Sequence, residues 1–557
     1  MGLFAPYGYG LLFIIEIFKD LAVAETRERI YLFDTTLRDG AQTQGVEFSL
    51  EDKILIAEAL DGLGLDYIEG GYPGANPTDS GYFQETRNFQ SAKNTAFGMT
   101  KRVGRSISND AGFSSILDAK VDAICLVAKS WDYHVRVALG VTNEENLLTI
   151  TESVEAIRDS GREALIDCEH FFDGYKSNPD YALSCVKTAY EAGARWIVLC
   201  DTNGGTLPHE VSEIVDAVTQ IVPGDHIGIH AHNDTDNAVA NSLAAIQSGA
   251  RQVQGTLNGL GERCGNANLT SIIPTLLLKP DFASKYETGI TAQQLRTITH
   301  ASRLLDEVLN RAPDHSQPYV GSSAFAHKGG IHVSAVKKDP STYEHVEPEL
   351  VGNSRKLLVS GQAGKSNILA ELERLDILVD HDDDRVDELL KDVKARSSVG
   401  YVYDGADASF ELLARRHLGE VPRFFAVDSF RVMVERRYNS SGQLITVSEA
   451  MVKVTVNGET HAHVGEGNGP VHALDQALRK DLGPYQPFIT DLQLVDYKVR
   501  ILTGGTDAIT RVLIESADAD GKRWHTVGVS TNIVDASFEA LVDSINYKLL
   551  RDGAVVS

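Results

Sequence analysis

The sequence predicts an α/β protein: a (β/α)8 TIM barrel, then a helical linker region, then a duplicated α+β C-terminal regulatory domain. Three observations lead to this prediction. Short apolar runs alternate with segments of helical apolar periodicity from residue 29 onward. Eight such strand–helix units fit within about 250 residues, the usual length of a barrel. Two similar strand-rich segments begin near the C-terminus, at Val427 and Val495.

The eight predicted barrel strands are short and mostly apolar. They are "RIYLFDT", "LDYIEGG", "NTAFGMT", "VDAICLVA", "EALIDCEH", "ARWIVLCDT", "HIGIHAH" and "RQVQGTL". Several of the helical segments between them end in Gly-Ala or Gly-Leu, as expected at a helix C-terminus. A doubly wound sheet is the alternative, but it rarely needs eight successive units.

The 557 residues are enough for roughly three to four domains. We predict an N-terminal extension at 1–28, the catalytic barrel at 29–290, helical linker subdomains at 291–397, and a regulatory and dimerisation domain at 398–557. The apolar part of the extension is too short to span a bilayer, and Glu16 interrupts it. It lacks a basic start and a cleavage site, so we do not expect a signal peptide.

Composition excludes several classes of partner. The net charge is −26, from 78 acidic and 52 basic residues, so neither nucleic acid nor a membrane is expected as a partner. The five cysteines are scattered and form no C-x-x-C pair, which predicts reduced thiols in a cytoplasmic protein. Cys125 and Cys200 lie in apolar runs, where buried packing is expected.

Polar residues gather where the predicted strands end. In a barrel of this kind, chemistry takes place at the carboxyl ends of the strands. The side chains at these ends are Asp39, Glu69, Glu169, Thr202, His230 and His232. Residues two apart on a strand point to the same side, so the two histidines could bind one ion with a carboxylate such as Asp39.

The tripeptide His-Ala-His occurs twice, in "GIHAHNDTD" at 228–236 and in "THAHVGE" around His461 and His463. A lone H-x-H on a strand is usually structural. The first copy has carboxylates at neighbouring strand ends and is interpreted as a metal site. The second lacks such companions and is interpreted as structural or surface-exposed.

Several long motifs resemble the α-isopropylmalate synthase/homocitrate synthase family, a branch of the metal-dependent aldolase-type lyase barrels. They are "FDTTLRDGAQTQGVEFSLEDK", "HAHND" and "GLGERCGNANL". The stretches "YIEGGYPGANPTD", "EHFFDGYKSNPDYA" and "AFAHKGGIHVSAVKKDPSTYEH" most resemble the branch that makes (R)-citramalate. The segment "TGGTDAITRV" is similar to the domain of this family that senses leucine or isoleucine.

The resemblance implies a role for each matching residue. The metal ligands would be Asp39, His230, His232 and Asn266. Arg38 would bind substrate and stabilise the developing oxyanion, with Glu69 orienting it. Glu169 would be catalytic, Thr202 would bind the 2-oxo acid carboxylate, and His332 would reach an active site from the linker, often that of the other subunit.

The implied reaction joins acetyl-CoA to pyruvate, giving (R)-citramalate and CoA for isoleucine biosynthesis. It implies one divalent metal ion, with Mg²⁺ or Mn²⁺ expected and Co²⁺ or Zn²⁺ as alternatives. It also implies a homodimer with isoleucine as feedback effector. Three lysines, Lys328, Lys337 and Lys338, could contact the CoA phosphates, although a solvated basic loop is the alternative.

Three other functions stay open. A 2-isopropylmalate synthase would use the larger 2-oxoisovalerate, because the pocket that selects the 2-oxo acid cannot be sized from sequence. A lyase running in the cleavage direction normally lacks a duplicated C-terminal domain. A non-catalytic amino-acid sensor would have lost metal ligands, and all four candidates are present.

Overall fold

The computed structural model describes residues 27–357, 364–380, 382–403, 405–438, 440–480, 482–505 and 508–556. Most of the predicted N-terminal extension, residues 1–26, lies outside these ranges. Contacts divide the chain into two compact units, Met1–Phe325 with Val346–Ser354, and Ala326–His345 with Arg355–Ser557. The predicted domain boundaries at residues 290 and 397 stay predictions.

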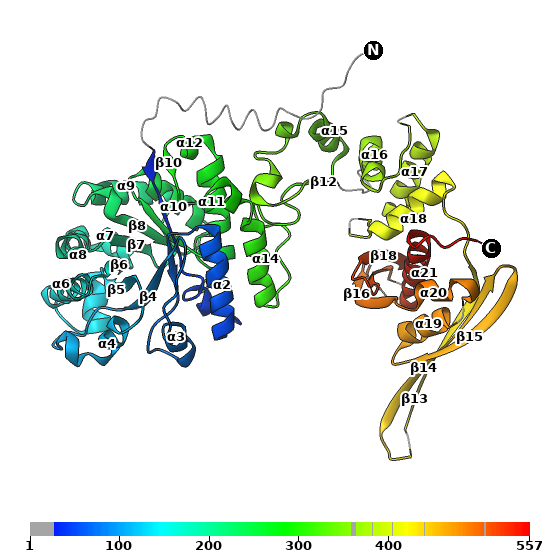
Figure 1. The fold of residues 1–557 in the computed structure, drawn as a ribbon, viewed down its shortest axis with the longest axis horizontal. Helices are drawn as coiled ribbons and strands as arrows, with labels where there is room; N and C mark the ends of the chain where they lie inside the picture. The colour runs from blue at the N-terminus through cyan, green and yellow to red at the C-terminus, as the bar shows by residue number, and fades with distance from the viewer. Residues whose placement is uncertain are drawn as a thin grey trace, which may run out of the picture. The chain divides into compact units, whose positions relative to one another are not determined.

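The first unit contains a closed barrel of eight parallel strands, and the predicted fold class is confirmed (Figure 1). In barrel order they are β2 (Tyr31–Asp34), β3 (Tyr67–Glu69), β4 (Lys93–Met99), β5 (Ala123–Lys129), β6 (Glu163–Glu169), β7 (Trp196–Asp201), β8 (Ile227–Ala231) and β9 (Gln252–Gly255). Six strands lie within the predicted apolar runs; β4 begins one residue before its run, at Lys93, and β5 ends one residue after its run, at Lys129.

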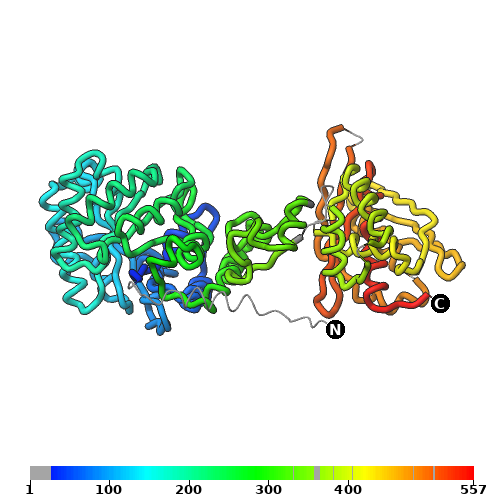
Figure 2. Tube along the Cα trace, turned by 90° about the horizontal axis from the view of Figure 1, so that it is seen from above, coloured from blue at the N-terminus to red at the C-terminus, as the bar shows by residue number. Residues whose placement is uncertain are grey.

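Helices follow the strands and cover the outside of the barrel (Figure 1). In Figure 2, the tube of this unit runs from blue through cyan to green. They are α2 (Leu50–Leu63), α3 (Pro77–Tyr82), α4 (Ala111–Leu117), α5 (Asp132–His134), α6 (Asn143–Asp159), α7 (Phe171–Ser177), α8 (Pro179–Ala192), α9 (Pro208–Thr219), α10 (Ala238–Gln247), α11 (Leu269–Leu278), α12 (Pro280–Ala283), α13 (Ala292–Leu295) and α14 (Ile298–Val308). A short pair of strands, β1 (Glu28–Arg29) and β10 (Tyr286–Glu287), lies beside them.

Local sequence explains where these helices begin and end. In α2, the Ser49 hydroxyl accepts a hydrogen bond from the Asp52 amide, and the Asp52 carboxylate accepts one from the Ser49 amide. This reciprocal pair satisfies amides that have no partner inside the helix. The helix ends at Gly64, whose φ of 92° is accessible to glycine at little cost.

The barrel interior is filled by side chains. Inward-facing residues of alternating strand positions form one buried cluster, made of Phe33, Tyr67, Ala123, Cys125, Leu165, Trp196, Val198 and Cys200. Cys125 and Cys200 are buried, as predicted. The Trp196 indole donates to the Tyr67 hydroxyl at 3.0 Å, and that hydroxyl donates to Glu163 at 2.8 Å. In barrels of this kind the interior is packed, and ligands bind at the carboxyl ends of the strands.

The second unit begins with two short parallel strands and four helices. These are β11 (Ala326–His327), α15 (Gly330–Lys338), β12 (Lys356–Leu357), α16 (Lys365–Arg374), α17 (Asp384–Ser398) and α18 (Asp407–Leu418). A hydrophobic cluster packs α16 and α17 against α18 and β18, with Ile368, Leu389, Phe410 and Val527 among its buried members.

The remainder of this unit confirms the predicted duplication. Three antiparallel strands and a helix occur twice in the same order. The first copy is β13 (Ala426–Tyr438), β14 (Leu444–Val456), β15 (Glu459–Gly467) and α19 (Pro470–Arg479), and the second is β16 (Gln493–Ile501), β17 (Thr510–Ala517), β18 (Arg523–Ser530) and α21 (Ile533–Arg551), with α20 (Gln486–Ile489) between them. Helix α19 packs on the first sheet and α21 on the second.

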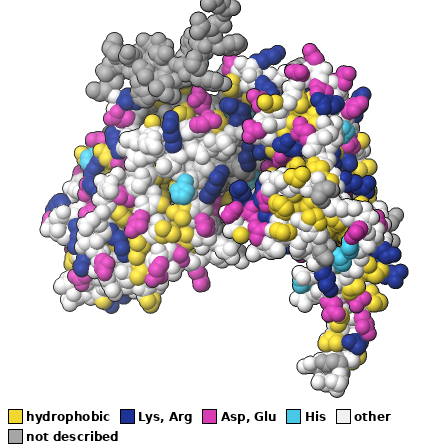
Figure 3. All heavy atoms as spheres, turned by 45° about the vertical axis from the view of Figure 1, so that its right-hand side comes forward, with side chains coloured by type: hydrophobic (Ala, Val, Ile, Leu, Met, Phe, Trp, Pro, Cys, Tyr) yellow, Lys and Arg dark blue, Asp and Glu magenta, His cyan; other side chains and the backbone are white. Residues whose placement is uncertain are grey.

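The surface carries charges of both signs. On the face drawn in Figure 3, acidic and basic side chains are interspersed. Within the described residues, no helix is both long enough and apolar enough to cross a membrane.

Candidate active site

The structure brings three predicted metal ligands together at the upper end of the barrel. Asp39 follows β2, His230 lies on β8, and His232 follows β8. All three are buried, and their ligand atoms lie within 4.8 Å of one another. His230 Nε2 is 3.4 Å from Asp39 Oδ2. The described residues contain no other group of three or more such side chains, so this cluster is where a metal ion could bind.

The protonation states of these groups suit a cation. Burial raises the pKa of the Asp39 carboxyl, but Arg38, His230 and His232 lower it more, so the net shift is downward and the carboxylate stays charged. Burial, with His230 nearby, lowers the pKa of His232 to about 3. The neutral imidazole is the form that binds metals.

Asn266 is the fourth predicted ligand and tests whether this site fits a metal. Its Nδ2 donates to Asp39 Oδ2 at 3.1 Å and lies 3.3 Å from His230 Nε2. Its Oδ1 is buried without a hydrogen-bond partner among the described residues. Turning the amide over would exchange these two atoms in almost the same space and present Oδ1 to the cluster. An unpartnered buried oxygen beside two imidazoles and a carboxylate fits a divalent cation.

Glycine at position 261 leaves room for this amide. A Cβ added to Gly261 would lie 2.1 Å from Asn266 Oδ1, far inside van der Waals contact. The motif "GLGERCGNANL" therefore supplies both the amide and the space that it occupies.

Arg38 is held beside the cluster by three contacts. Its Nε donates to Glu69 Oε2 at 2.7 Å, it forms an ion pair with Asp39, and its guanidinium lies 3.9 Å from the centre of the Phe97 ring. Thr35 Oγ1 donates to the same Glu69 oxygen at 2.6 Å. Burial lowers the pKa of Arg38, but the carboxylates of Asp39 and Glu69 raise it by more. The net shift is upward, so the guanidinium stays charged.

Glu169 ends β6 and forms an ion pair with Lys129, which ends β5. The two residues are register partners on neighbouring parallel strands, so both side chains leave the barrel on the same side. Sequence reasoning missed Lys129, although its place directly after the predicted strand "VDAICLVA" was a signal.

Thr202 follows β7 and is hydrogen-bonded to the segment after β6 and to the loop after β9. Its Oγ1 accepts a hydrogen bond from the His170 amide at 2.8 Å, and its carbonyl accepts one from Arg263 Nη2 at 2.7 Å. Arg263, also missed, pairs with Asp234 and lies 2.7 Å from His232 Nδ1. This contact favours a proton on His232 Nε2, so a cation bound at Nε2 would require Arg263 Nη2 to withdraw.

A buried polar chain runs from the cluster into the barrel, and sequence reasoning missed it. His230 Nδ1 donates to Gln254 Oε1 at 2.8 Å, and Gln254 Nε2 donates to Asp167 Oδ1 at 3.1 Å. Burial raises the pKa of Asp167, with His230 and Arg38 opposing the shift. Barrel interiors are dominated by branched apolar residues, so the inward-facing Gln254 and Asp167 were the available signals.

His332 belongs to the second compact unit, on α15. Its side chain is exposed, and its ring lies 4.2 Å from that of Tyr343. The candidate phosphate-binding residues Lys328, Lys337 and Lys338 are in the same unit and are exposed.

Comparison with known families matches three consecutive parts of the chain. Residues 29–301 match the HMGL-like family, residues 319–400 the homocitrate synthase post-HMGL domain-like family, and residues 404–549 the LeuA allosteric (dimerisation) domain. A curated (R)-citramalate synthase from Aquifex aeolicus is 50% identical over 530 residues, which cover 94% of this chain and 98% of that protein. One from Synechocystis is 48% identical, covering 95% of this chain and 97% of that protein.

The chain belongs to the (R)-citramalate synthase family. The family resemblance predicted from the sequence motifs is thus confirmed. A probable 2-isopropylmalate synthase from Methanopyrus kandleri is a more distant relative, 35% identical and covering 93% of this chain and 98% of that protein.

In this member of the (R)-citramalate synthase family, the second His-Ala-His lies on β15, far along the chain from the barrel. His461 and His463 face Val454 and Val452 of β14 in the strand register. His461 is exposed, with Glu459 at 3.8 Å as its acidic neighbour. Among the described residues, neither His461 nor His463 belongs to a group of three or more potential metal ligands.

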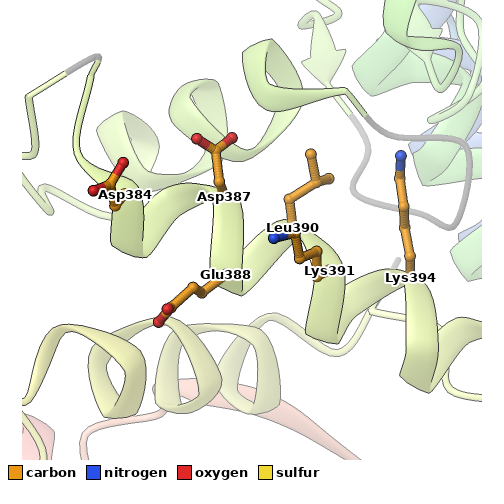
Figure 4. A pocket seen from close by; sticks show the side chains of 6 residues that line it. All are labelled: Asp384, Asp387, Glu388, Leu390, Lys391 and Lys394. Carbon is orange, nitrogen blue, oxygen red and sulfur yellow. The ribbon is translucent and has the colours of Figure 1, made fainter.

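This member also has a shallow pocket of about 530 Å³ along α17 (Figure 4). Asp387 and Lys394 point to one side of the helix and Glu388 to the other. Asp387 is paired with Lys365 at 2.9 Å. The side chains that line the pocket are both acidic and basic, so they favour neither an anionic nor a cationic ligand. We assign the pocket no function.

Proposed function

We propose that the chain condenses acetyl-CoA with pyruvate and water to give (R)-citramalate and free CoA. The observation that carries this proposal is the buried Asp39–His230–His232 cluster beside Arg38, at the catalytic end of a barrel. It occurs in a chain 50% identical to a relative named (R)-citramalate synthase along nearly its whole length. The pairing of pyruvate with acetyl-CoA follows from that relative's name and the family.

Asp39, His230, His232 and Asn266 would hold the divalent cation. Bound there, the cation would act as a Lewis acid that polarises the carbonyl of the 2-oxo acid. The mixed nitrogen and oxygen ligands are compatible with Mg²⁺ or Mn²⁺, and also with Co²⁺ or Zn²⁺.

Arg38 would bind the 2-oxo acid and stabilise the negative charge that forms on its carbonyl oxygen. The guanidinium is already held in place by Glu69 and Phe97, so little reorganisation is needed when the charge develops. Glu69 is in this account a positioning residue. Thr202, at the end of β7, would contact the substrate carboxylate.

A base, Glu169 or His332, would remove a proton from the methyl group of acetyl-CoA. The resulting carbanion equivalent would form the new carbon–carbon bond to the carbonyl carbon of pyruvate, and the former carbonyl oxygen would take up the proton that the base removed, giving the hydroxyl of citramalyl-CoA. Water then cleaves the thioester, releasing citramalate and the CoA thiol. The resemblance implies that His332 reaches an active site from the linker, often that of the other subunit.

A homodimer is proposed from the match to the LeuA allosteric (dimerisation) domain. The outer strands β13 and β16 support this, because they expose apolar side chains to solvent in the single chain. These are Met433, Val434, Leu494, Val495, Val499 and Ile501. Isoleucine is the proposed feedback effector, and inhibition by leucine in its place would contradict this assignment.

The five cysteines are all free, which fits a reducing compartment, and we propose the cytoplasm.

The second candidate function is that of 2-isopropylmalate synthase, favoured by the 35% identical relative. Measuring kcat/KM from thiol release with pyruvate and with 2-oxoisovalerate separates the two. We expect pyruvate to be preferred at least tenfold, roughly the discrimination that one or two methyl groups support in a fitted pocket. A preference for 2-oxoisovalerate would favour the second candidate.

A further inference from the structure

The buried residues below the metal-ligand cluster have no assigned role. Gln254 and Asp167 point into the barrel from β9 and β6, and they are 1% and 4% exposed. Neither is among the candidate ligands or catalytic residues. Their hydrogen bonds nevertheless reach His230, one of the candidate ligands.

The chain of hydrogen bonds has a direction. Asp167 in its carboxylate form only accepts, so the Gln254 atom that faces it must be the Nε2 amide group, 3.1 Å away. The other end of the Gln254 amide, Oε1, then faces His230 Nδ1 at 2.8 Å. A carbonyl oxygen only accepts, so Nδ1 must carry the proton.

This direction fixes the state of the histidine. With the proton on Nδ1, the neutral His230 ring has its lone pair on Nε2. Nε2 is the atom directed at the cluster, 3.4 Å from Asp39 Oδ2 and 3.3 Å from Asn266 Nδ2. Histidines that bind metals commonly donate their second ring nitrogen to such an acceptor, which sets the tautomer and the ring orientation.

We propose that Gln254, oriented by Asp167, is a positioning residue that holds His230 in the tautomer required for binding a divalent cation. The inference rests on the proposed metal site, and it assigns to the barrel interior a part in metal affinity. It also explains why two polar side chains occupy a layer that is apolar in most barrels.

The same strand provides a matched control. Gln252 lies two residues before Gln254, also points into the barrel, and is 0% exposed. Its amide has no hydrogen-bond partner among the described residues, and it lies beside Gly228 and not beside a candidate ligand. Replacing either glutamine with methionine removes an amide from the barrel interior at nearly constant volume. Only one of the two changes affects His230.

The experiment measures Mn²⁺ binding to the purified full-length chain by electron paramagnetic resonance of the free ion. We expect Gln254→Met to weaken the Kd about 10- to 100-fold, the usual effect of losing such a support. Gln252→Met should stay within about twofold of the wild type. Equal Kd values for Gln254→Met and the wild type would overturn the inference, and so would equal weakening in both variants.

A third variant separates tautomer control from packing. Gln254→Glu keeps an oxygen that accepts from His230 Nδ1, so it should bind Mn²⁺ at least about tenfold more tightly than Gln254→Met. A Kd as weak as that of Gln254→Met would show that the effect is one of packing. If Gln254→Met does not fold, Asp167→Asn replaces it. There the added amide lets Gln254 turn over, so we expect weakening of at least about threefold, and unchanged binding would overturn the inference.

Failure of this inference is distinguishable from failure of the proposed function. If the wild type binds Mn²⁺ and makes citramalate while Gln254→Met binds equally well, only the role of Gln254 is wrong. A wild type that makes citramalate with no Mn²⁺ bound would overturn the metal site itself, and with it this inference.

Discussion

Arg38 Nε donates to Glu69 Oε2 at 2.7 Å, and the Glu69 side chain is completely buried. The two residues come from different strand ends, and the sequence places them 31 positions apart. Burial raises the pKa of Glu69 while Arg38 lowers it, so the carboxylate depends on its guanidinium partner to remain charged. The pair therefore acts as a unit.

Glu69→Gln should lower kcat about 100-fold and leave the KM for acetyl-CoA nearly unchanged. The amide keeps the size of the side chain but loses the charge that holds Arg38, and displacement of a positioned group by about 1 Å can cost that much. Steady-state thiol release measures both constants. A raised KM with unchanged kcat would show that Glu69 serves binding alone.

The two His-Ala-His sequences give a matched pair of substitutions. His232→Ala should lower the rate at least about 100-fold, because one lost stabilising group in an active site is worth about 3–4 kcal/mol. His463 is half-buried but belongs to no candidate ligand group among the described residues, so His463→Ala should change the rate by no more than roughly twofold. Metal content and pyruvate-dependent thiol release check both variants. Loss of metal in His463→Ala but not in His232→Ala would place the site in the C-terminal domain.

Gly261→Ala should weaken metal binding at least about tenfold. Its Cβ would lie 2.1 Å from Asn266 Oδ1, so the amide must move away from Asp39 and His230. Gly205→Ala is the control, because a Cβ there has no neighbour within 4 Å. Isothermal titration with Mn²⁺ compares the two. Equal affinities would show that Asn266 is not a ligand.

Asp34→Asn should change how stability depends on pH. Burial raises the pKa of Asp34 from 3.8 to about 7, with Thr36 hydrogen bonds opposing the shift. Between these two values the folded state binds a proton that the unfolded state does not, so Asp34 lowers wild-type stability as pH rises through this window. Asparagine has no such titration.

The Tm of Asp34→Asn relative to wild type should therefore increase between pH 5 and pH 8. Thermal unfolding at the two pH values measures this difference. The substitution removes one of the Asp34 oxygens that accept hydrogen bonds from Thr36; this loss shifts both Tm values equally, so only the change with pH matters. A Tm difference that is constant with pH would show that Asp34 titrates in its ordinary range.

Much of the barrel could be predicted from sequence, because each buried strand is a short apolar run and several of these runs end in polar residues. Residues such as Asp39 and His230 were recognisable because their types and strand-end positions suffice. Gln254, Asp167 and Lys129 were not, since their significance depends on register between neighbouring strands. Arg263 reaches His232 through a loop whose path no local pattern specifies.

The central claim is the reaction, and the product tests it most directly. The purified full-length chain is incubated with acetyl-CoA, pyruvate and Mn²⁺, and the acids formed are separated by chiral chromatography and compared with the CoA released. The account predicts (R)-citramalate, one molecule for each CoA thiol. Thiol release without citramalate, or a condensation product only with 2-oxoisovalerate, would contradict it.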